Sequence, residues 1–357
     1  MPQTDDEQDR LDLYSYELPR ELIAQHPMEH RIDARLMRID RKTGQIEHFY
    51  VRDLPDLIEP GDALVLNSSK VIPARLVGTR TSTGGKWEGL YLREEEQGVW
   101  EILSKTRGHL TVGETISLRD KDGRSTPQLT VLGKLDDGHL AVRPLSDLST
   151  EEVLQKYGRV PLPPYIRDGQ MIDKDSETYQ TVYARQPGSV AAPTAGLHFT
   201  SDLIRFLQER GTLTAAVTLH VGLGTFRPVS AARLSEHKMH YEWGELPEPS
   251  AAKLRQCRDH GRRVVAVGTT SARILEAAAL ETTQPLTAWK GETNLFIRPP
   301  YQFQAVDALM TNFHLPRSTL LVLVSALAGR ELILRAYQEA IEQRYRFYSY
   351  GDCMLIV

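Results

Sequence analysis

The sequence predicts an α/β protein, with a mostly parallel sheet, flanking helices and a small inserted antiparallel β-barrel. Two observations favour this fold class. Strand-like and helix-like segments alternate toward both ends of the chain, whereas short apolar segments separated by turn signals such as Gly84-Gly85 and Asp122-Gly123 fill the stretch between about residues 75 and 150. We therefore expect a discontinuous α/β catalytic domain of residues 1–72 and 153–357, with a barrel domain of residues 73–152 inserted into it.

The individual elements follow from apolar periodicity and turn chemistry. The predicted barrel strands cover residues 87–92, 99–103, 129–135 and 140–142. The predicted strands of the α/β domain cover residues 64–66, 213–221 and 264–267, and its predicted helices cover residues 201–210, 251–260 and 272–280. Thr200 or Ser201 is expected to cap the first of these helices, and Ser318 is expected to cap a further buried helix.

Composition limits the class of protein. The chain has 357 residues, a net charge of −4 and only two cysteines, Cys257 and Cys353, which excludes a disulfide framework and a four-thiolate zinc site within one chain. The N-terminal residues show no signal-peptide pattern, and the longest apolar run, Leu320 to Leu327, is too short to span a bilayer. We expect a cytoplasmic protein with no membrane segment, in which any nucleic acid is bound by a local basic patch.

Histidines and glycines are concentrated between residues 191 and 242. Core packing calls for apolar side chains, whereas this stretch places imidazoles next to glycines that let a ligand approach the backbone. These residues are His198, His220, His237, His240, Gly196, Gly222 and Gly224. The blocks PTAGLHFT and LHVGLGTF look like two rims of one ligand pocket at the carboxyl ends of strands.

The segment RRVVAVGTTSARILEAA predicts a strand, a turn and a helix. Hydroxyls and amide groups at the start of that helix favour a bound carboxylate or phosphate, which Arg273 could hold in a bidentate manner. The alternative is that Thr269, Thr270 and Ser271 are helix caps and nothing more.

Two further sets of polar residues need an explanation. His237 and His240 have a spacing that could hold a metal on a helix, but an acid–base pair of His240 and Glu242 on an extended segment is the preferred interpretation. The other set is Asn312 and His314, which packing does not explain.

Together, the motifs resemble the S-adenosylmethionine:tRNA ribosyltransferase-isomerases of queuosine biosynthesis. The resemblance extends from Tyr16 to Met354, and its longest blocks are APTAGLHFT, LHVGLGTFRPV, HKMH, GTTSARILE, TNLFIRPPYQF, TNFHLPRSTLLVLVSALAG and YSYGDCMLI. The resemblance implies an α/β domain with an inserted barrel. It also implies transfer and isomerisation of the ribosyl group of S-adenosylmethionine onto 7-aminomethyl-7-deazaguanine at the tRNA wobble position. Epoxyqueuosine-tRNA, adenine and methionine would be the products, formed by a monomer without a metal or further cofactor.

This reaction needs a base, an acid and groups that bind anions. The candidates for proton transfer are His198, His220, His240 and Glu242. The candidates for binding S-adenosylmethionine are Thr194, Gly196, Gly222, Gly224, Thr269, Thr270, Ser271, Arg273, Asn312 and His314. The candidates for binding tRNA are Lys70, Arg75, Arg298 and Tyr348.

Two blocks depart from the family pattern. The chain has Ser68 where the family has an aspartate, and it reads Arg31-Ile32-Asp33, which shifts the expected acid by one place. The sequence therefore assigns no catalytic role to a carboxylate in either block.

Two other functions are alternatives. An S-adenosylmethionine-dependent tRNA methyltransferase is one, but the chain has no G-x-G-x-x-G turn after an early strand. A non-catalytic tRNA-binding protein is the other, and it would not need the histidine-rich centre.

Overall fold

The computed structural model describes residues 8–120, 122–135, 138–222, 229, 231–282 and 284–357. These residues form two compact units, one from residues 1–70 with 178–357 and the other from residues 71–177. The predicted domain boundaries at residues 73 and 152 stay a prediction. The two units are described separately below.

The first unit is built on a mixed sheet in the order β15-β13-β12-β3-β14-β16-β17-β1-β2. The four strands β12, β3, β14 and β16 are parallel to one another, and the flanking pairs β12–β13 and β16–β17 are antiparallel. The strands are β1 (Arg35–Ile39), β2 (Ile46–Tyr50), β3 (Ala63–Asn67), β12 (Leu213–Leu219), β13 (Glu242–Leu246), β14 (Val264–Val267), β15 (Trp289–Thr293), β16 (Ala308–Asn312) and β17 (Cys353–Ile356). A separate ribbon pairs β4 (Ser69–Val71) with β11 (Gln186–Ser189).

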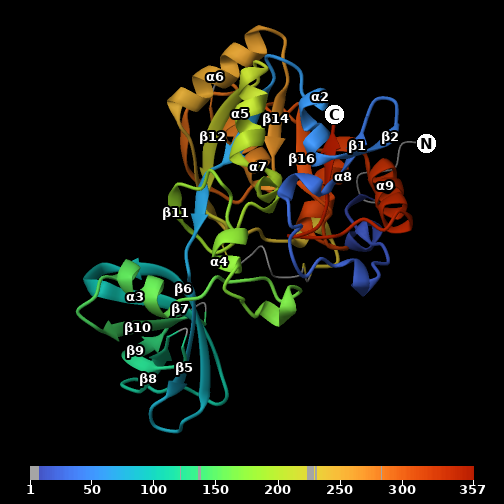
Figure 1. Cartoon of the computed structure of the whole chain (residues 1–357). Helices are drawn as coiled ribbons and strands as arrows, with labels where there is room; N and C mark the ends of the chain where they lie inside the picture. Colours follow the sequence, from blue (N-terminus) through green and yellow to red (C-terminus); the bar gives the residue numbers. More distant parts are fainter. Residues whose placement is uncertain (1–7, 121, 136–137, 223–228, 230, 283) are drawn as a thin grey trace. The chain divides into compact units, whose positions relative to one another are not determined.

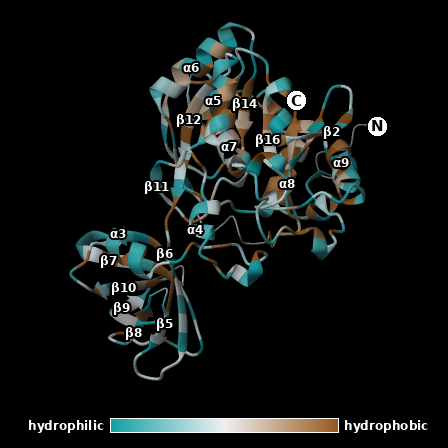
Figure 2. Cartoon of the chain, in the orientation of Figure 1, coloured by the Kyte–Doolittle hydropathy of each residue, from teal (hydrophilic) through white to brown (hydrophobic). Residues whose placement is uncertain are grey.

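Central strands of this sheet are buried on both faces. Every residue of β3, β14 and β16 is buried, as expected of parallel strands covered by helices on both sides. Leu203 and Leu207 of α5 share a core cluster with Leu64 and Leu66 of β3, so α5 covers the face to which these residues point. Helices α6 and α7 contact β12, β3 and β14 (Figure 1). Figure 2 shows hydrophobic residues on the central strands and hydrophilic ones along α6.

The helices start where local sequence satisfies their first turns. Thr200 accepts a hydrogen bond from the Leu203 amide at the start of α5, and Ser318 does the same for Leu321 at the start of α8. Helix α7 begins at Thr269, three residues earlier than predicted, directly after Gly268 with φ of 87°. The helices are α2 (Leu54–Leu57), α3 (Thr150–Tyr157), α4 (Asp175–Thr178), α5 (Ser201–Glu209), α6 (Glu248–Asp259), α7 (Thr269–Glu281), α8 (Thr319–Ala328) and α9 (Arg330–Glu342).

The order in which the chain adds strands to the sheet reverses at β3. From β3 the next strand of the parallel group is β12, on one side, and the following strand, β14, lies on the other side of β3. In open α/β sheets such a reversal leaves a crevice at the carboxyl ends of the strands, where ligands bind. The ends of β3 and β14 are therefore the first place to look for a site.

The second unit contains a closed barrel in the order β10-β7-β6-β5-β8-β9. Its strand β6 alternates between exposed and buried residues, and Trp87, Trp100 and Ile102 fill the interior. The strands are β5 (Arg75–Arg80), β6 (Lys86–Glu95), β7 (Val99–Thr106), β8 (Thr115–Arg119), β9 (Ser125–Lys134) and β10 (Leu140–Leu145). The predicted fold class, an α/β sheet with flanking helices plus a small antiparallel barrel, is confirmed.

Within the described ranges, no helix has both the length and the apolar character needed to cross a bilayer.

Replacement of Ser318 with alanine tests the cap of α8. The variant loses the acceptor for the Leu321 amide, which typically costs about 1 kcal/mol and lowers the midpoint of thermal unfolding by about 2–4 °C. Ser318→Asp keeps an acceptor at that position and is expected to unfold close to the wild-type midpoint. Equal midpoints for the alanine and wild-type proteins would show that the cap contributes nothing.

Candidate functional site at the carboxyl edge of the parallel strands

The ends of several strands bring the predicted site residues to one edge of the sheet. Strand β12 ends just before His220, β14 ends just before Gly268, and β16 ends at Asn312. Because β13 is antiparallel to β12, its first residue, Glu242, lies at the same edge. Residues far apart in the sequence therefore meet where the topology predicts a crevice.

A buried ion pair joins Glu242 to Arg273. Arg273 Nη1 donates to Glu242 Oε2, and the two side chains are only 8% and 7% exposed. Glu242 Oε1 accepts the Gly222 amide at 3.0 Å, while Arg273 Nε donates to the Leu295 carbonyl at 3.2 Å. The second terminal nitrogen of Arg273 is buried and has no hydrogen-bond partner in the described part of the chain. It is therefore a cationic donor available to an anion.

Asn312 connects three elements of the edge. Its Oδ1 accepts the Thr194 hydroxyl at 2.9 Å, and its Nδ2 lies 3.2 Å from both His198 Nε2 and the Tyr348 carbonyl. Since a carbonyl can only accept, the amide nitrogen must face it, and His198 Nε2 must accept as well. His198 consequently carries its proton on Nδ1. The lone pair of its Nε2 is used by Asn312, so the Nδ1–H is the group that it can offer to a ligand.

Burial keeps His198 neutral. The side chain is 5% exposed, and desolvation, with smaller contributions from the nearby Arg31 and Arg346 charges, lowers the pKa of His198 from 6.5 to about 4. His314 is also buried, which lowers its pKa to about 3. However, His314 Nε2 lies 3.0 Å from the Thr311 hydroxyl, and within the described chain it makes no hydrogen bond to the Asn312 network.

The imidazole of His220 packs against Trp243 and Gly188. Its ring stacks on Trp243 with centroids 5.2 Å apart, and a Cβ atom added to Gly188 would lie 3.1 Å from the other face of the imidazole. Burial lowers the pKa of His220, and its Nδ1 has no partner among the residues that the structure covers. His220 is thus a neutral imidazole with a nitrogen available for a ligand.

The structure does not pair His240 with Glu242, which was the preferred interpretation of this block. Residues 237–241 are not helical, so the helical metal spacing does not arise, and His240 is exposed whereas Glu242 is buried. Glu242 makes its ion pair with Arg273, and no bond between His240 and Glu242 is present in the described chain. Among the residues described, no cluster of three or more histidine, cysteine or acidic side chains could hold a metal ion.

The hydroxyls at the start of α7 divide by orientation. Ser271 Oγ donates back to the Val267 carbonyl at 2.8 Å, so it satisfies the helix and not a ligand. Thr270 Oγ1 is buried without a partner in the described ranges, and no side chain caps this helix. Gly268, and not one of these hydroxyl residues, is the N-cap, so the helix-cap alternative does not account for the Thr270 hydroxyl.

The predicted glycines have different surroundings. Among the described residues, no atom lies within 4 Å of a Cβ atom built on Gly222. A Cβ atom on Gly196 would overlap the Tyr183 hydroxyl, so a side chain, and not a ligand, takes the space that Gly196 provides. Gly224 lies outside the described residues.

The four tRNA candidates are not equally accessible. Lys70 is exposed, whereas Arg75 donates to the Gly169 carbonyl and to Glu88, and Arg298 pairs with Asp9 at 3.0 Å. Tyr348 is 6% exposed, so its ring is not a surface for stacking a base in this conformation.

The two departures from the family pattern also have local partners. Ser68 Oγ donates to the Val217 carbonyl, and Asp33 pairs with Arg52.

Buried polar atoms without partners reveal residues that the sequence did not single out. They include the hydroxyls of Thr181 and Tyr183. These residues lie in segments without a recognisable motif, so the unsatisfied hydrogen bonds are their only signal, and that signal requires coordinates.

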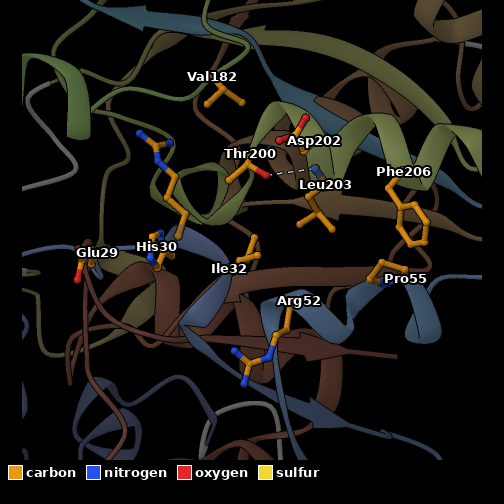
Figure 3. Close-up of a pocket in the computed structure, with 11 residues that line it drawn as sticks. Glu29, His30, Ile32, Arg52, Pro55, Val182, Thr200, Asp202, Leu203 and Phe206 are labelled. Carbon is orange, nitrogen blue, oxygen red and sulfur yellow. Dashed lines mark hydrogen bonds between the residues drawn. The ribbon is translucent and has the colours of Figure 1, made fainter.

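A cavity of about 520 Å³ lies in the same unit. Figure 3 shows its apolar side, which includes Ile32, Leu203 and Phe206, and its charged side chains, such as Arg52 and Asp202. None of the predicted site residues lines it. Arg52, one of the residues that line it, is paired with Asp33.

The fold defines an α/β protein with an inserted barrel, and its candidate site lies at the carboxyl edge of the sheet. Comparison with known proteins identifies the family. The chain belongs to the queuosine biosynthesis protein family, whose model matches residues 11–356. A relative from Symbiobacterium thermophilum named S-adenosylmethionine:tRNA ribosyltransferase-isomerase is 50% identical over 350 residues, covering 98% of this chain and all of the relative. The crystal structure of S-adenosylmethionine tRNA ribosyltransferase from Thermotoga maritima is 38% identical, covers 97% of this chain and all of that chain, and has a TM-score of 0.55.

A double-mutant cycle tests the buried ion pair. Arg273→Leu and Glu242→Leu each leave one buried charge uncompensated, and each is expected to lower the free energy of unfolding by about 3–5 kcal/mol. The double variant buries neither charge and is expected to lose less than the sum of the two single losses. Urea unfolding of the four proteins measures this, and additive losses would show that the two side chains do not interact.

The lowered pKa of His198 predicts acid sensitivity. Between pH 6.5 and about 4 the unfolded chain binds a proton that the folded chain does not, so stability falls as pH falls through this window, by about 3 kcal/mol for this group. In His198→Gln the free energy of unfolding should change less between pH 7 and pH 4.5, with His314 supplying part of the remaining slope. Equal slopes in the two proteins would contradict the assignment.

Proposed function

We propose that the protein transfers and isomerises the ribosyl moiety of S-adenosylmethionine onto a tRNA base, as an S-adenosylmethionine:tRNA ribosyltransferase-isomerase. The observation that carries the proposal is the 50% identity to a relative of that name over the whole length of the relative. The acceptor is the aminomethyl group of 7-aminomethyl-7-deazaguanine at the wobble position. The products are epoxyqueuosine-tRNA, adenine and methionine.

The chemistry starts from the sulfonium ion of S-adenosylmethionine. Its positive charge acidifies the hydrogens on the adjacent ribose carbon, so a positioned base removes one as a proton. Over the whole reaction, adenine leaves with the electron pair of its glycosidic bond and gains a proton, and methionine leaves with the pair of the carbon–sulfur bond. The amine of the tRNA base loses a proton as its nitrogen bonds to the ribosyl group, and the electron pair left on the deprotonated carbon forms a new bond within the rearranged ribosyl group.

We assign the first proton transfer to His220. Its Nδ1 is buried without a partner in the described chain, and burial holds its pKa below the ordinary value, so the lone pair is free at neutral pH. His198 has the opposite arrangement, because Asn312 occupies its Nε2 and leaves the Nδ1–H as a donor. In the proposal His198 donates a hydrogen bond to the leaving adenine, and exposed His240 serves a later proton transfer.

Charge complementarity supports a place for the methionine part of the substrate. Methionine carries a carboxylate next to the cationic sulfonium, and the site offers a guanidinium next to a carboxylate. Arg273 Nη2, Thr270 Oγ1 and the open first turn of α7 are proposed to bind the substrate carboxylate. Glu242 then faces the sulfonium in this proposal.

The tRNA is proposed to bind with its wobble base unstacked, because the exocyclic amine must reach the reacting carbon. Exposed Lys70 supplies a phosphate contact in this proposal. The monomeric state and the cytoplasmic location belong to the same proposal. The two buried free thiols, Cys257 and Cys353, fit a reducing compartment.

A product assay tests the function and the role of His220 together. Purified protein, S-adenosylmethionine and tRNA carrying the aminomethyl-deazaguanine base should release adenine and methionine, and neither should form without that tRNA. His220→Ala should lower kcat by about 10²–10⁴-fold. In the wild type, kcat/KM should fall as pH drops through the His220 pKa, below 6.5, because protonation removes the base.

Different products would separate the alternatives. S-adenosylhomocysteine in place of adenine and methionine would identify a methyltransferase, and tRNA binding without turnover would identify a non-catalytic binding protein. Full activity of His220→Ala alongside the expected products would remove only the assignment of the base.

A further inference from the structure

Two hydroxyls next to the site have no role in the function described so far. Thr181 is only 4% exposed, and both its Oγ1 and the hydroxyl of Tyr183 are buried. Neither oxygen has a hydrogen-bond partner in the part of the chain that the structure describes. We call these two groups, which are two residues apart in the chain, the hydroxyl pair.

The pair lies against the segment that carries His198. A Cβ atom on Gly196 would overlap the Tyr183 hydroxyl and would lie 2.8 Å from Thr181 Cγ2. Gly196 belongs to the short helix η7 (Thr194–His198), whose two end residues both hydrogen-bond Asn312. The same helix approaches the start of α7, because a Cβ atom on Gly268 would lie 3.7 Å from Ala195 Cβ. The hydroxyl pair therefore adjoins the Asn312 network and the turn before α7.

An unsatisfied buried hydroxyl destabilises a protein. A phenylalanine and a valine would fill the same volumes without that cost, so packing alone does not account for the hydroxyls. Burial also raises the pKa of Tyr183, which keeps its hydroxyl protonated and able both to donate and to accept. A threonine hydroxyl has the same dual character.

The chemistry of the pair identifies the group it suits. A ribose presents adjacent hydroxyls, each of which also donates and accepts, so two protein hydroxyls can satisfy two sugar hydroxyls without burying a net charge. The adjoining residues already provide for the other parts of S-adenosylmethionine. Arg273 and Thr270 lie where its carboxylate is proposed to bind, and His198 lies where its adenine is proposed to leave.

We propose that Thr181 and Tyr183 bind the ribose hydroxyls of S-adenosylmethionine and position the sugar for the reaction. This inference rests on the proposed function and adds to it two binding residues from a segment outside the recognised motifs. The hydroxyls are unsatisfied in the free protein and become satisfied when the sugar binds.

The variants Tyr183→Phe and Thr181→Val test the proposal with two readouts. Each removes an unsatisfied group, so the midpoint of thermal unfolding of the free protein should equal or exceed that of the wild type. Each also removes a hydrogen bond to the substrate, so the Kd for S-adenosylmethionine, measured by calorimetry without tRNA, should rise about tenfold. A merely structural hydroxyl would not move the two readouts in opposite directions.

Competition by adenosine analogues locates the contact on the ligand. Adenosine should displace S-adenosylmethionine from the wild type more strongly than 2′-deoxyadenosine or 3′-deoxyadenosine does, since a site that hydrogen-bonds a hydroxyl rejects the analogue that lacks it. In Tyr183→Phe the preference for adenosine over one deoxy analogue should disappear, and in Thr181→Val the preference over the other should disappear.

Tyr301→Phe is the matched control, because the Tyr301 hydroxyl donates to buried Glu276 at 2.8 Å. This variant should lose stability and keep its affinity for S-adenosylmethionine. Wild-type affinity in both Tyr183→Phe and Thr181→Val would overturn the inference and leave the proposed function intact. A wild-type protein that binds no S-adenosylmethionine would overturn the proposed function and the ribose assignment with it.

Discussion

The ion pair of Glu242 and Arg273 is the interaction on which the rest of the site depends. It links the first residue of β13 to the first turns of α7, and through the Gly222 amide it also fixes the chain leaving β12. A buried pair of this kind is costly to desolvate, so it offers little net stability over apolar residues. Its value lies in holding two opposite charges in fixed positions, with one guanidinium nitrogen left for a ligand.

A second constraint comes from Asn312. One amide side chain with a single workable orientation sets the tautomer of His198, because the Tyr348 carbonyl can only accept a hydrogen bond. The two histidines nearest the edge therefore differ in what they offer, although both are neutral. His198 presents an N–H, and the proposed mechanism uses the Nδ1 of His220, which has no partner in the described chain, as the base.

The sequence predicts most of the architecture and only part of the site. Apolar runs such as Val264–Val267 and turn pairs such as Gly84-Gly85 are local signals, so the fold class and the first helices could be anticipated. Strand β5 (Arg75–Arg80) could not be predicted, because its sequence mixes charged and apolar residues. It forms a strand only through pairing with its neighbours in the barrel. The side-chain partners of the site residues also come from distant parts of the sequence. The motif around Glu242 pointed to His240, whereas its charge is balanced by Arg273 from another block.

The position of β17 has a consequence for biosynthesis. This late strand lies between β1 and β16, and the Arg35 amide bonds the Asp352 carboxylate across 317 residues. During translation the β1–β2 hairpin must wait for a partner that leaves the ribosome about 300 residues later, with Leu36 and Met37 uncovered meanwhile. Such long-range pairing slows folding. The nascent chain is therefore a natural client for chaperones, and a premature stop before residue 353 would leave the sheet split between β16 and β1.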